Sequence, residues 1–477
     1  MTYTRGLLAV ALALLPAEAQ TPADTRAALL SSVDKLAPFW TAMSRKIWEN
    51  PEISFHETAS SALIRDALRG AGFTIRDRVA GMPTAFIAEW GQGAPVIGII
   101  GEYDALPGLS QIDSPERKPR AEGAPGHGCG HNLFGTASAL AAIAVKQHLE
   151  AGRLPGVIRY YGTPAEEGGA GKVYMIRAGV FKDAAAVLAW HPWNANQADD
   201  NPWLANINVR VRYTGRAAHA AAAPDAGRSA LDAAELFAHA INLLREHVPQ
   251  ETRMHYVYLK GGSAANIVPD SSEMSVIVRH PDLATLESIW ERVRNAAQAG
   301  ALGTGTEVSI STVSGYANYL PNPTLRDLID ANLRRVGGVH YTAEERKFAE
   351  AIRATLGSSK LPPLDDASRI MPPKPDLLSA STDVGDVSWN APTGHLLAAT
   401  FPPGVPLHTW QSTAIAGTSI GQKGLVVAAK TLALTAADLF HTPALAAKAK
   451  ADFDNALRGR SYRSLIPADA KPPLPTQ

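Results

Sequence analysis

The chain has 477 residues, more than a single hydrophobic core usually spans, so its length predicts two domains. Its 45 lysine and arginine residues balance its 45 aspartate and glutamate residues. Proteins that bind nucleic acid or anionic membranes concentrate basic charge, so this balance offers no electrostatic case for either partner. We therefore expect a well-packed globular protein of enzyme size.

Residues 1–19 have the pattern of an export signal. Arg5 gives a positive start, Gly6–Leu15 is an apolar run too short to span a bilayer, and Ala17–Ala19 is a small-x-small cleavage site. We expect the mature chain to begin at Gln20 and to be periplasmic or secreted. No later stretch is expected to be long and apolar enough to cross a membrane.

Short apolar runs and helix patterns alternate through the first part of the chain. Buried strands are predicted at Val96–Ile100, Gly156–Tyr161 and Ala184–Trp190, because each run is bounded by turn residues. Helices are predicted at Asn132–Glu150 and Ala170–Gly179. This alternation indicates an α/β fold, with helices flanking a mixed, mainly parallel sheet.

A different pattern occupies residues 204–319. The expected elements are, in order, a strand at Asn206–Tyr213, a helix from a capping box at Ser229 to Arg245, strands at His255–Leu259 and Met274–Arg279, a helix at Leu283–Ala301 and a strand at Glu307–Val313. This order describes an inserted ferredoxin-like α+β lid domain. The catalytic domain would then be discontinuous, over residues 20–203 and 320–442.

Strand and helix patterns like those of the first part of the chain resume after Asn322. The later features are a capping box at Thr342–Glu345 for a helix to Leu356, a long loop at Gly357–Asp376, an amphipathic segment from Ala444 and a proline-rich tail at Pro467–Gln477. We expect residues 443–477 to form a C-terminal extension, with a peripheral or disordered tail.

The only cysteine, Cys129, lies between two histidines in Gly126–Asn132. Exported proteins usually pair their cysteines, and this one has no partner in the sequence. Residue type alone favours an inert buried thiol. The neighbouring glycines and histidines favour a metal ligand instead, because glycine permits close backbone approach and thiolate with imidazole suits zinc.

Further polar residues follow the predicted strands, at the sheet edge where α/β proteins bind ligands. Cys129, His131, Glu167, His191 and His408 could hold two metal ions with one ligand shared. Two ions about 3.5–4 Å apart can activate a water and polarise a carbonyl. Glu166 would then be free to act as general base and acid. The alternatives are a solvated glutamate pair and structural histidines.

Several motifs together resemble the aminoacylase and carboxypeptidase-G type metallopeptidase family. They are Gly101–Pro107, Gly126–Asn132, Thr163–Glu167, Gly215–His219 with Pro224, Asn266–Pro269, Leu320–Pro323, Ser381–Trp389 and Pro406–Gln411. The similarity extends from the signal to about Phe440. Within this family, the motifs most resemble the amidohydrolase branch, in which cysteine replaces the bridging aspartate.

The resemblance implies roles for these positions. Cys129 would bridge two divalent metal ions, zinc or manganese or cobalt, and Asp104 would orient a ligand from behind. His219 would polarise the scissile carbonyl or stabilise its oxyanion, and in this family it often reaches the active site of the partner subunit. Asn266 and Arg279 would hold a substrate carboxylate. A homodimer through the lid, or assembly with a homologous subunit, would follow.

Four acidic or histidine residues near these motifs stay without an assigned role. Glu102 stands where relatives usually carry aspartate or histidine, and His127 is expected to support the site rather than bind metal. For Asp383 and Asp386, helix capping or contacts behind the ligands are the modest interpretations.

The expected activity is hydrolysis of the amide in N-acyl or N-aroyl amino acids with a free carboxylate, such as p-aminobenzoyl-glutamate. A dipeptidase or another N-acyl amino acid deacylase is the alternative within the same class. A catalytically silent protein that binds carboxylates or metal is the alternative from another class, and an intact Glu166 argues against it.

Overall fold

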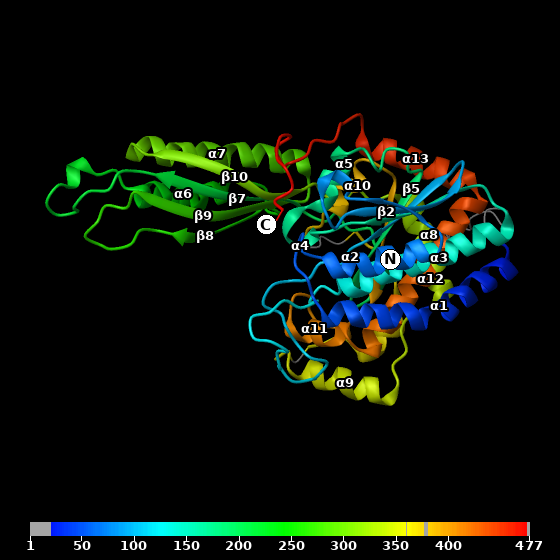
Figure 1. The fold of residues 1–477 in the computed structure, drawn as a ribbon. Coiled ribbons are helices and arrows are strands. Elements are labelled where there is room, and N and C mark those ends of the chain that lie inside the picture. Colours follow the sequence, from blue (N-terminus) through cyan, green and yellow to red (C-terminus); the bar gives the residue numbers. More distant parts are fainter. Residues whose placement is uncertain (1–20, 359, 376–379, 475–477) are drawn as a thin grey trace, which may run out of the picture.

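The computed structural model describes residues 21–358, 360–375 and 380–474, so the predicted signal and the start at Gln20 lie outside the described residues. The chain folds into a large α/β body and a lid that projects from one side of it (Figure 1). The lid strands begin at Ala205 and end at Tyr316, and the chain then returns to the body. The body is therefore built from two separate stretches of sequence.

The body is organised around one eight-stranded sheet. Its spatial order is β1 (Thr74–Asp77), β2 (Phe86–Gln92), β4 (Gly156–Gly162), β3 (Val96–Gly101), β5 (Ala186–Trp193), β12 (Thr393–Ala399), β6 (Asn196–Ala198) and β11 (Ile370–Met371). The four central strands, β4, β3, β5 and β12, are parallel, and β2 and β6 flank them in the antiparallel direction. The prediction of a mixed, mainly parallel sheet is confirmed.

Strand β4 illustrates why the central strands were recognisable in the sequence. All its residues are buried, and successive side chains point to opposite faces. The Tyr160 hydroxyl donates to the Gly135 carbonyl oxygen of helix α3 (His131–Gly152) at 3.3 Å. Tyr161 packs against Phe181 in the opposite layer, with ring centroids 4.4 Å apart. A strand covered on both faces is apolar throughout its length.

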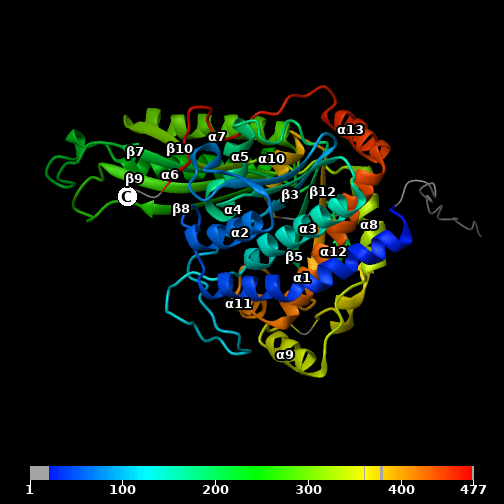
Figure 2. The ribbon, with the colours of Figure 1, turned by 45° about the vertical axis from the view of Figure 1, so that its right-hand side comes forward.

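Helices cover the sheet in layers. Helices α3 and α12 (Ser419–His441) pack against its centre, and α1 (Ala23–Glu49) lies across both (Figure 2). Many alanines along α3 permit this close approach. The other body helices are α2 (Thr58–Gly70), α4 (Glu166–Gly169), α5 (Gly171–Arg177), α8 (Pro323–Val336), α9 (Ala343–Ala354), α10 (Val384–Ser388), α11 (Trp410–Ala416) and α13 (Pro443–Leu457), with 3-10 turns η2 (Val79–Gly81) and η5 (Leu364–Ser368).

Helix α12 corrects one expectation from the sequence. Among the described residues it is the one helix whose length and composition would suffice to cross a membrane. However, 78% of its apolar window is buried inside the protein. A helix that is apolar all round belongs in a core or in a bilayer, and here it packs between the sheet and α1.

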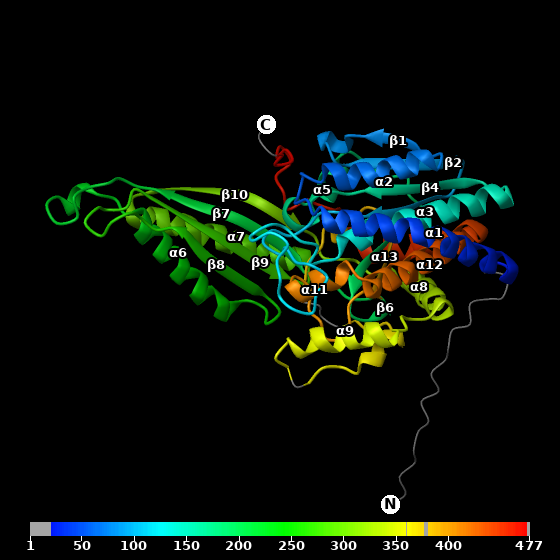
Figure 3. The ribbon, with the colours of Figure 1, turned by 60° about the horizontal axis from the view of Figure 1, so that its bottom comes forward.

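The lid is a four-stranded antiparallel sheet with two helices. Its elements are β7 (Ala205–Thr214), η3 (Pro224–Ala226), α6 (Ala230–Leu244), η4 (Arg245–His247), β8 (Arg253–Lys260), β9 (Ser271–His280), α7 (Leu283–Thr304) and β10 (Glu307–Tyr316), with strand order β10-β7-β9-β8. This is the predicted ferredoxin-like arrangement. The Ser229 hydroxyl caps α6 by accepting from the Asp232 N–H at 3.1 Å. The lid extends away from the body (Figure 3).

One expectation for the last third of the chain is corrected. The stretch Gly357–Asp376 contains η5 and strand β11, which pairs in parallel with β6 at the sheet edge. The capping box at Thr342–Glu345 is confirmed and begins α9. The described residues 467–474 of the predicted tail are exposed or partly exposed, as expected of a peripheral segment, and Ile466, directly before them, is buried in the core of the body.

Residues 458–474 form a C-terminal strap at the junction of lid and body (red in Figure 1). The Tyr462 hydroxyl donates to Asp386 Oδ1 at 2.7 Å, and the Arg177 guanidinium donates to Ser464 Oγ at 3.1 Å. Leu465 packs on strand β10 of the lid, where the absence of a side chain at Gly315 makes room for it. The strap therefore contacts both domains and restrains their relative position.

Replacing Tyr462 with phenylalanine should leave the buried Asp386 oxygen without its donor. The free energy of unfolding should fall by about 1–3 kcal/mol, the usual cost of an unsatisfied buried polar group. The Tyr341 hydroxyl is buried with no hydrogen-bond partner among the described residues, so Y341F is a matched control that should be neutral. Urea unfolding, monitored by tryptophan fluorescence, measures the free energy of unfolding of both variants. Equal effects of the two variants would contradict an anchoring role for Tyr462.

Candidate active site

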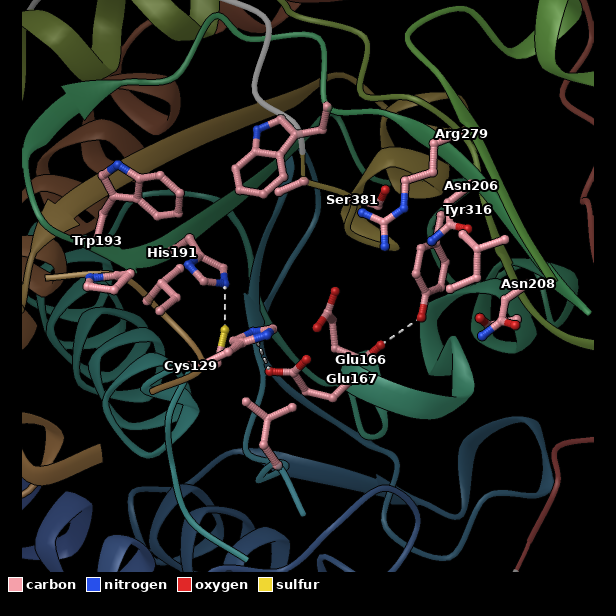
Figure 4. A pocket seen from close by; sticks show the side chains of 18 of the residues that line it. Cys129, Glu166, Glu167, His191, Trp193, Asn206, Asn208, Arg279, Tyr316 and Ser381 are labelled. Carbon is pink, nitrogen blue, oxygen red and sulfur yellow. Dashed lines mark hydrogen bonds and ion pairs between the residues drawn. The ribbon is translucent and has the colours of Figure 1, made fainter. Parts of the chain in front are cut away.

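A cavity of about 730 Å³ lies where the lid meets the body, within the size range of small-molecule sites. Figure 4 shows residues of both domains around it. The body contributes Leu106, Cys129, Glu166, Glu167, His191, Trp193, Asn194, Trp203, Ala380, Ser381, Pro406, Leu407 and His408, and the lid contributes Asn206, Asn208, Ile277, Arg279, Ser314 and Tyr316.

The parallel strands place the body residues of this cavity. Asp104 follows β3, Glu166 and Glu167 follow β4, His191 lies near the end of β5, and His408 lies on the loop after β12. The carboxyl ends of parallel strands meet at one sheet edge, so residues far apart in sequence converge there. Cys129 and His131 reach the same edge from the start of α3.

Two of these segments, at Ala165 and at His408, have a strained backbone conformation. Ala165, directly before Glu166, has φ 59°, and His408 has φ 60°. Residues with a Cβ rarely adopt this left-handed conformation, and it occurs disproportionately at functional sites. At Ala165 it turns the chain sharply from β4 into α4, which starts with the glutamate pair.

Three groups of potential metal ligands lie close together among the described residues, with ligand atoms within 4.8 Å of one another in each. Cys129, His131 and His191 form the first, Cys129, Glu167 and His408 form the second, and Glu102, His131 and Glu166 form the third. The first and second share Cys129, and we call these two the ligand groups. Cys129 Sγ lies 3.4 Å from His191 Nε2, and His408 Nε2 lies 3.3 Å from Glu167 Oε1. His131 Nε2 and Glu167 Oε1 are buried and form no hydrogen bond of good geometry among the described residues, although Glu102 Oε2 lies 3.1 Å from the first and His408 Nε2 lies 3.3 Å from the second. The donor set therefore fits divalent cations.

Asp104 orients ligands of both groups. Its Oδ1 hydrogen-bonds His131 Nδ1 at 2.9 Å, and its Oδ2 accepts from the Glu167 N–H at 2.9 Å. Burial alone would raise the pKa of Asp104, but the His131 ring, the Glu167 N–H and the charge of Lys172 together outweigh it and lower the pKa. His191 is fixed similarly, since its Nδ1 lies 2.8 Å from the Pro192 carbonyl oxygen and Nε2 is left to face Cys129. Partners of this kind fix the ring orientation of metal-binding histidines.

Burial and crowded negative charge control protonation here. Burial raises the pKa of the Cys129 thiol well above its ordinary value, and nearby Glu167 raises it further. Burial also raises the pKa of Glu166 well above its usual range, reinforced by the charges of Glu167 and Glu102. Cations at the two ligand groups would counter both effects, because positive charge favours thiolate and carboxylate.

The sequence did not reveal a buried ion network behind the ligands. Lys172 Nζ lies 2.6 Å from Glu102 Oε1 and 2.6 Å from Asp383 Oδ1, and all three side chains are fully buried. Glu102 Oε2 also lies 3.1 Å from His131 Nε2. Lys172 lies near the start of the short helix α5, whose other charged residue is Arg177, and no sequence pattern identified the partners of Lys172.

His127 is buried near the ligands but belongs to neither group. Burial, helped by the charge of His131, lowers the pKa of His127 to about 3, so its ring is neutral. Asp386 also lies apart from the ligands, because its carboxylate accepts from the Ala317 N–H at 2.9 Å and from Tyr462.

The predicted lid residues do not gather in one place. Arg279, on β9, lines the cavity, whereas His219 and Asn266 are exposed on loops beyond the opposite end of the lid sheet. These two loops are joined by a hydrogen bond from the Ala220 N–H to the Asn266 carbonyl oxygen at 3.0 Å. Ten strand residues span about 33 Å, so neither residue reaches the cavity of its own chain.

Sequence reasoning also missed the lid residues beside Arg279. Asn206 on β7 is paired in register with Arg279, and Asn208, Ser314 and Tyr316 line the same cavity. The Asn206 and Asn208 side-chain oxygens are buried without partners among the described residues. The signal was present in β7, where buried Ile207 and Val209 alternate with these asparagines and give the strand a polar face.

The α/β fold with its lid, and the convergent thiolate, imidazole and carboxylate donors beside a free glutamate, define a metal-dependent hydrolase of linear amides or peptides. Residues 205–304 match the peptidase dimerisation domain family. The chain is 39% identical to a subunit of p-aminobenzoyl-glutamate hydrolase from Escherichia coli K12, over 91% of this chain and 95% of the relative. It therefore belongs to the M20 metallopeptidase family, the aminoacylase and carboxypeptidase-G type family.

Other relatives agree with this membership. Xaa-Arg dipeptidase of Mus musculus is 32% identical over 92% of this chain and 95% of the relative. A Bacillus subtilis structure described as a dinuclear metal-binding M20 peptidase has TM-score 0.59 and 19% identity, and covers 86% of this chain and 99% of its own. An aminobenzoyl-glutamate utilization protein from Klebsiella pneumoniae has TM-score 0.57 and 18% identity, with coverages of 82% and 96%. These two structures share the fold.

Replacing Cys129 with serine should lower metal occupancy of both ligand groups, because serine is a much weaker donor than a thiolate. Replacing His408 with alanine removes a donor from one group only and should lose less metal. Elemental analysis of metal per chain, after equal exposure to a chelator, compares the two variants. A C129S protein with the metal content of the wild type would contradict a shared ligand.

Proposed function

We propose that this protein is an exported dinuclear-metal amidohydrolase that cleaves the amide bond of N-acyl or N-aroyl amino acids such as p-aminobenzoyl-glutamate. One observation carries the proposal: Cys129 belongs to both ligand groups while Glu166 lines the same cavity. The similarity to a subunit of p-aminobenzoyl-glutamate hydrolase supports the substrate class. The signal pattern of residues 1–19 supports a periplasmic or secreted location.

Cys129, His131 and His191 would hold one divalent ion, and Cys129, Glu167 and His408 the other. When bound, such ions polarise a substrate carbonyl and lower the pKa of water. Thiolate and imidazole favour zinc, and the carboxylate also admits manganese or cobalt. Asp104 keeps the His131 ring and the Glu167 backbone in place for this role.

Glu166 is the group that moves protons. Its carboxylate accepts a proton from the attacking water and returns it to the amide nitrogen as the carbon–nitrogen bond breaks, so an amine and a carboxylic acid leave. The adjacent Glu167 belongs to one of the two groups that share Cys129 and Glu166 belongs to neither of them, which keeps the two roles separate. The Tyr316 hydroxyl donates to the Glu166 backbone carbonyl oxygen at 2.9 Å and fixes this turn beneath the lid.

Arg279 binds the free carboxylate of the substrate. It lines the cavity from the lid, and a planar guanidinium can donate two parallel hydrogen bonds to a carboxylate. Its in-register neighbour Asn206 adds an amide on the same face of the lid sheet. The cavity is thus furnished for an amide whose amino-acid half carries a negative charge.

A dipeptidase is the second candidate, favoured by the 32% identity to Xaa-Arg dipeptidase. It would use the same ligands and the same Glu166. Peptides and acyl amino acids differ in the group on the acyl side of the bond, so a liquid-chromatography screen of both classes separates the candidates. A silent carboxylate-binding protein would have no use for Glu166.

Replacing Glu166 with glutamine keeps the shape of the side chain but removes the proton acceptor. Turnover of p-aminobenzoyl-glutamate should fall by about 100- to 10,000-fold, the usual contribution of general acid–base catalysis. Metal content should stay at the wild-type level by elemental analysis. The exposed Glu291 on the lid helix α7 offers the control E291Q, which should retain full activity. An active E166Q enzyme would refute the mechanism.

The lid supports a homodimer, or assembly with a homologous subunit. Strand β8 is at the edge of the lid sheet, and Val257 and Leu259 on it are 56% and 50% exposed. An unpaired edge with exposed apolar side chains is a surface that a second chain can cover. His219 and Asn266 would then reach the cavity of the partner, where His219 polarises the scissile carbonyl and Asn266 assists Arg279 at the carboxylate.

Mixing two inactive variants tests this cross-subunit role. H219A and E166Q should each be inactive alone, but a mixed dimer contains one site with both residues intact. Random exchange of subunits should restore about a quarter of wild-type activity, since half the dimers are mixed and each has one competent site of two. Light scattering confirms the oligomer. An active monomer, or no recovery from mixed dimers, would refute the role of His219 in the partner.

A further inference from the structure

Two tryptophans line the cavity beside a candidate metal ligand. Trp193 lies two residues after His191 on β5, and Trp203 lies just before the lid. Ring centroids are 6.2 Å apart for His191 and Trp193, 6.0 Å for His191 and Trp203, and 6.1 Å for the two tryptophans. We call Trp193 and Trp203 the aromatic wall.

The aromatic wall is held rigidly from behind. Trp203 is 3% exposed, and its Nε1 donates to Asp199 Oδ2 at 2.6 Å. The same oxygen lies 2.6 Å from His395 Nδ1, and the His395 ring meets Trp203 edge-on at 5.6 Å. The Trp193 carbonyl oxygen accepts from the Thr400 N–H at 2.8 Å, which fixes that backbone to the end of β12.

Trp193 is only half-buried and presents part of its indole to the cavity. A large apolar ring kept open to a cavity on a rigid support is suited to contact with a ligand. A flat aromatic ring of the ligand would make the most favourable contact with this indole, because aromatic rings pack edge-to-face or offset with centroids about 4.5–7 Å apart. The arrangement of His191, Trp193 and Trp203 already follows this geometry.

The opposite side of the cavity is polar. Figure 4 places Arg279, Asn206 and Asn208 across the cavity from Trp193, with the glutamate pair, Glu166 and Glu167, between the two sides. A substrate whose carboxylate meets Arg279 and whose amide lies near Glu166 therefore directs its acyl group toward the aromatic wall. The two halves of the cavity differ in chemistry as the two halves of an aroyl amino acid do.

We propose that Trp193 and Trp203 form the acyl-group subsite and select flat aromatic acyl groups over small aliphatic ones. This inference rests on the proposed amidohydrolase function. It assigns the aromatic end of the substrate to the body and the charged end to the lid. Trp193 supplies the exposed contact, and Trp203, through Asp199, holds it in place.

The test compares two substrates that release the same amino acid, p-aminobenzoyl-glutamate and N-acetyl-glutamate, with the metal-loaded full-length enzyme. W193A should lower kcat/KM for the aroyl substrate by about tenfold or more, the loss expected from one aromatic contact and its buried area, and leave the acetyl substrate within about twofold. W193F should recover most of the loss. W90A, at a half-buried tryptophan on β2 away from the cavity, should change neither.

An equal fall for both substrates, no change for either, or a larger fall for the acetyl substrate would overturn the proposal. Calorimetric titration of p-aminobenzoate into the same proteins measures the subsite without turnover, and W193A should weaken that binding while W90A should not. A wild-type enzyme that cleaves neither substrate would refute the proposed function. The p-aminobenzoate titration would then still support or overturn the aromatic subsite.

Discussion

The geometry of the site depends on the two hydrogen bonds of the Asp104 carboxylate. One reaches the His131 ring on helix α3, and the other reaches the Glu167 backbone after β4. Both partners are themselves candidate ligands, from different groups. Because Asp104 is almost fully buried, water cannot replace either bond, and the helix and the loop are locked in relative position. Cys129 can belong to both ligand groups only when the start of helix α3 and the loop after β4 are held in place.

The protein concentrates negative charge beneath this point. Glu57, Glu102, Glu166 and Asp383 are buried close to Asp104, and Lys172 is a fully buried cation that pairs with two of them. Burial first, and then the charge of Asp104, raise the pKa of Glu57 to about 8. Unpaired buried charge is costly, so such a cluster favours either protons or bound cations. The fold therefore concentrates buried negative charge that bound cations would balance.

The candidate substrate cavity lies at the junction of the two domains. The polar face of the lid sheet and the aromatic wall of the body enclose one cavity, and neither domain lines it alone. The C-terminal strap contacts both domains at this junction, so the relative position of Arg279 and the glutamate pair depends partly on residues near the end of the chain. Contacts remote from the chemistry can in this way influence which amides fit.

Local patterns in the chain were enough to predict the α/β body, the ferredoxin-like lid and the types of residue at the sheet edge. An apolar run marks a buried strand, and the residue after it falls at the carboxyl edge. The immediate neighbours of Cys129 also predicted a metal ligand there, and the structure places Cys129 in two groups of candidate ligands. The contacts between residues far apart in the chain came from the packed structure instead. Lys172 and Asp383 are 211 residues apart, and no periodicity in the chain encodes their contact.

The same difference between local pattern and packing applies to the predicted residues of the lid. Sequence motifs singled out His219, Asn266 and Arg279 together, but the strand length of β7 and β9 separates the first two from the third. The aromatic wall and the strap likewise depend on packing between segments that carry no local pattern. Residue chemistry and spacing are written along the chain, whereas mutual distance is set by the layers into which the strands and helices pack.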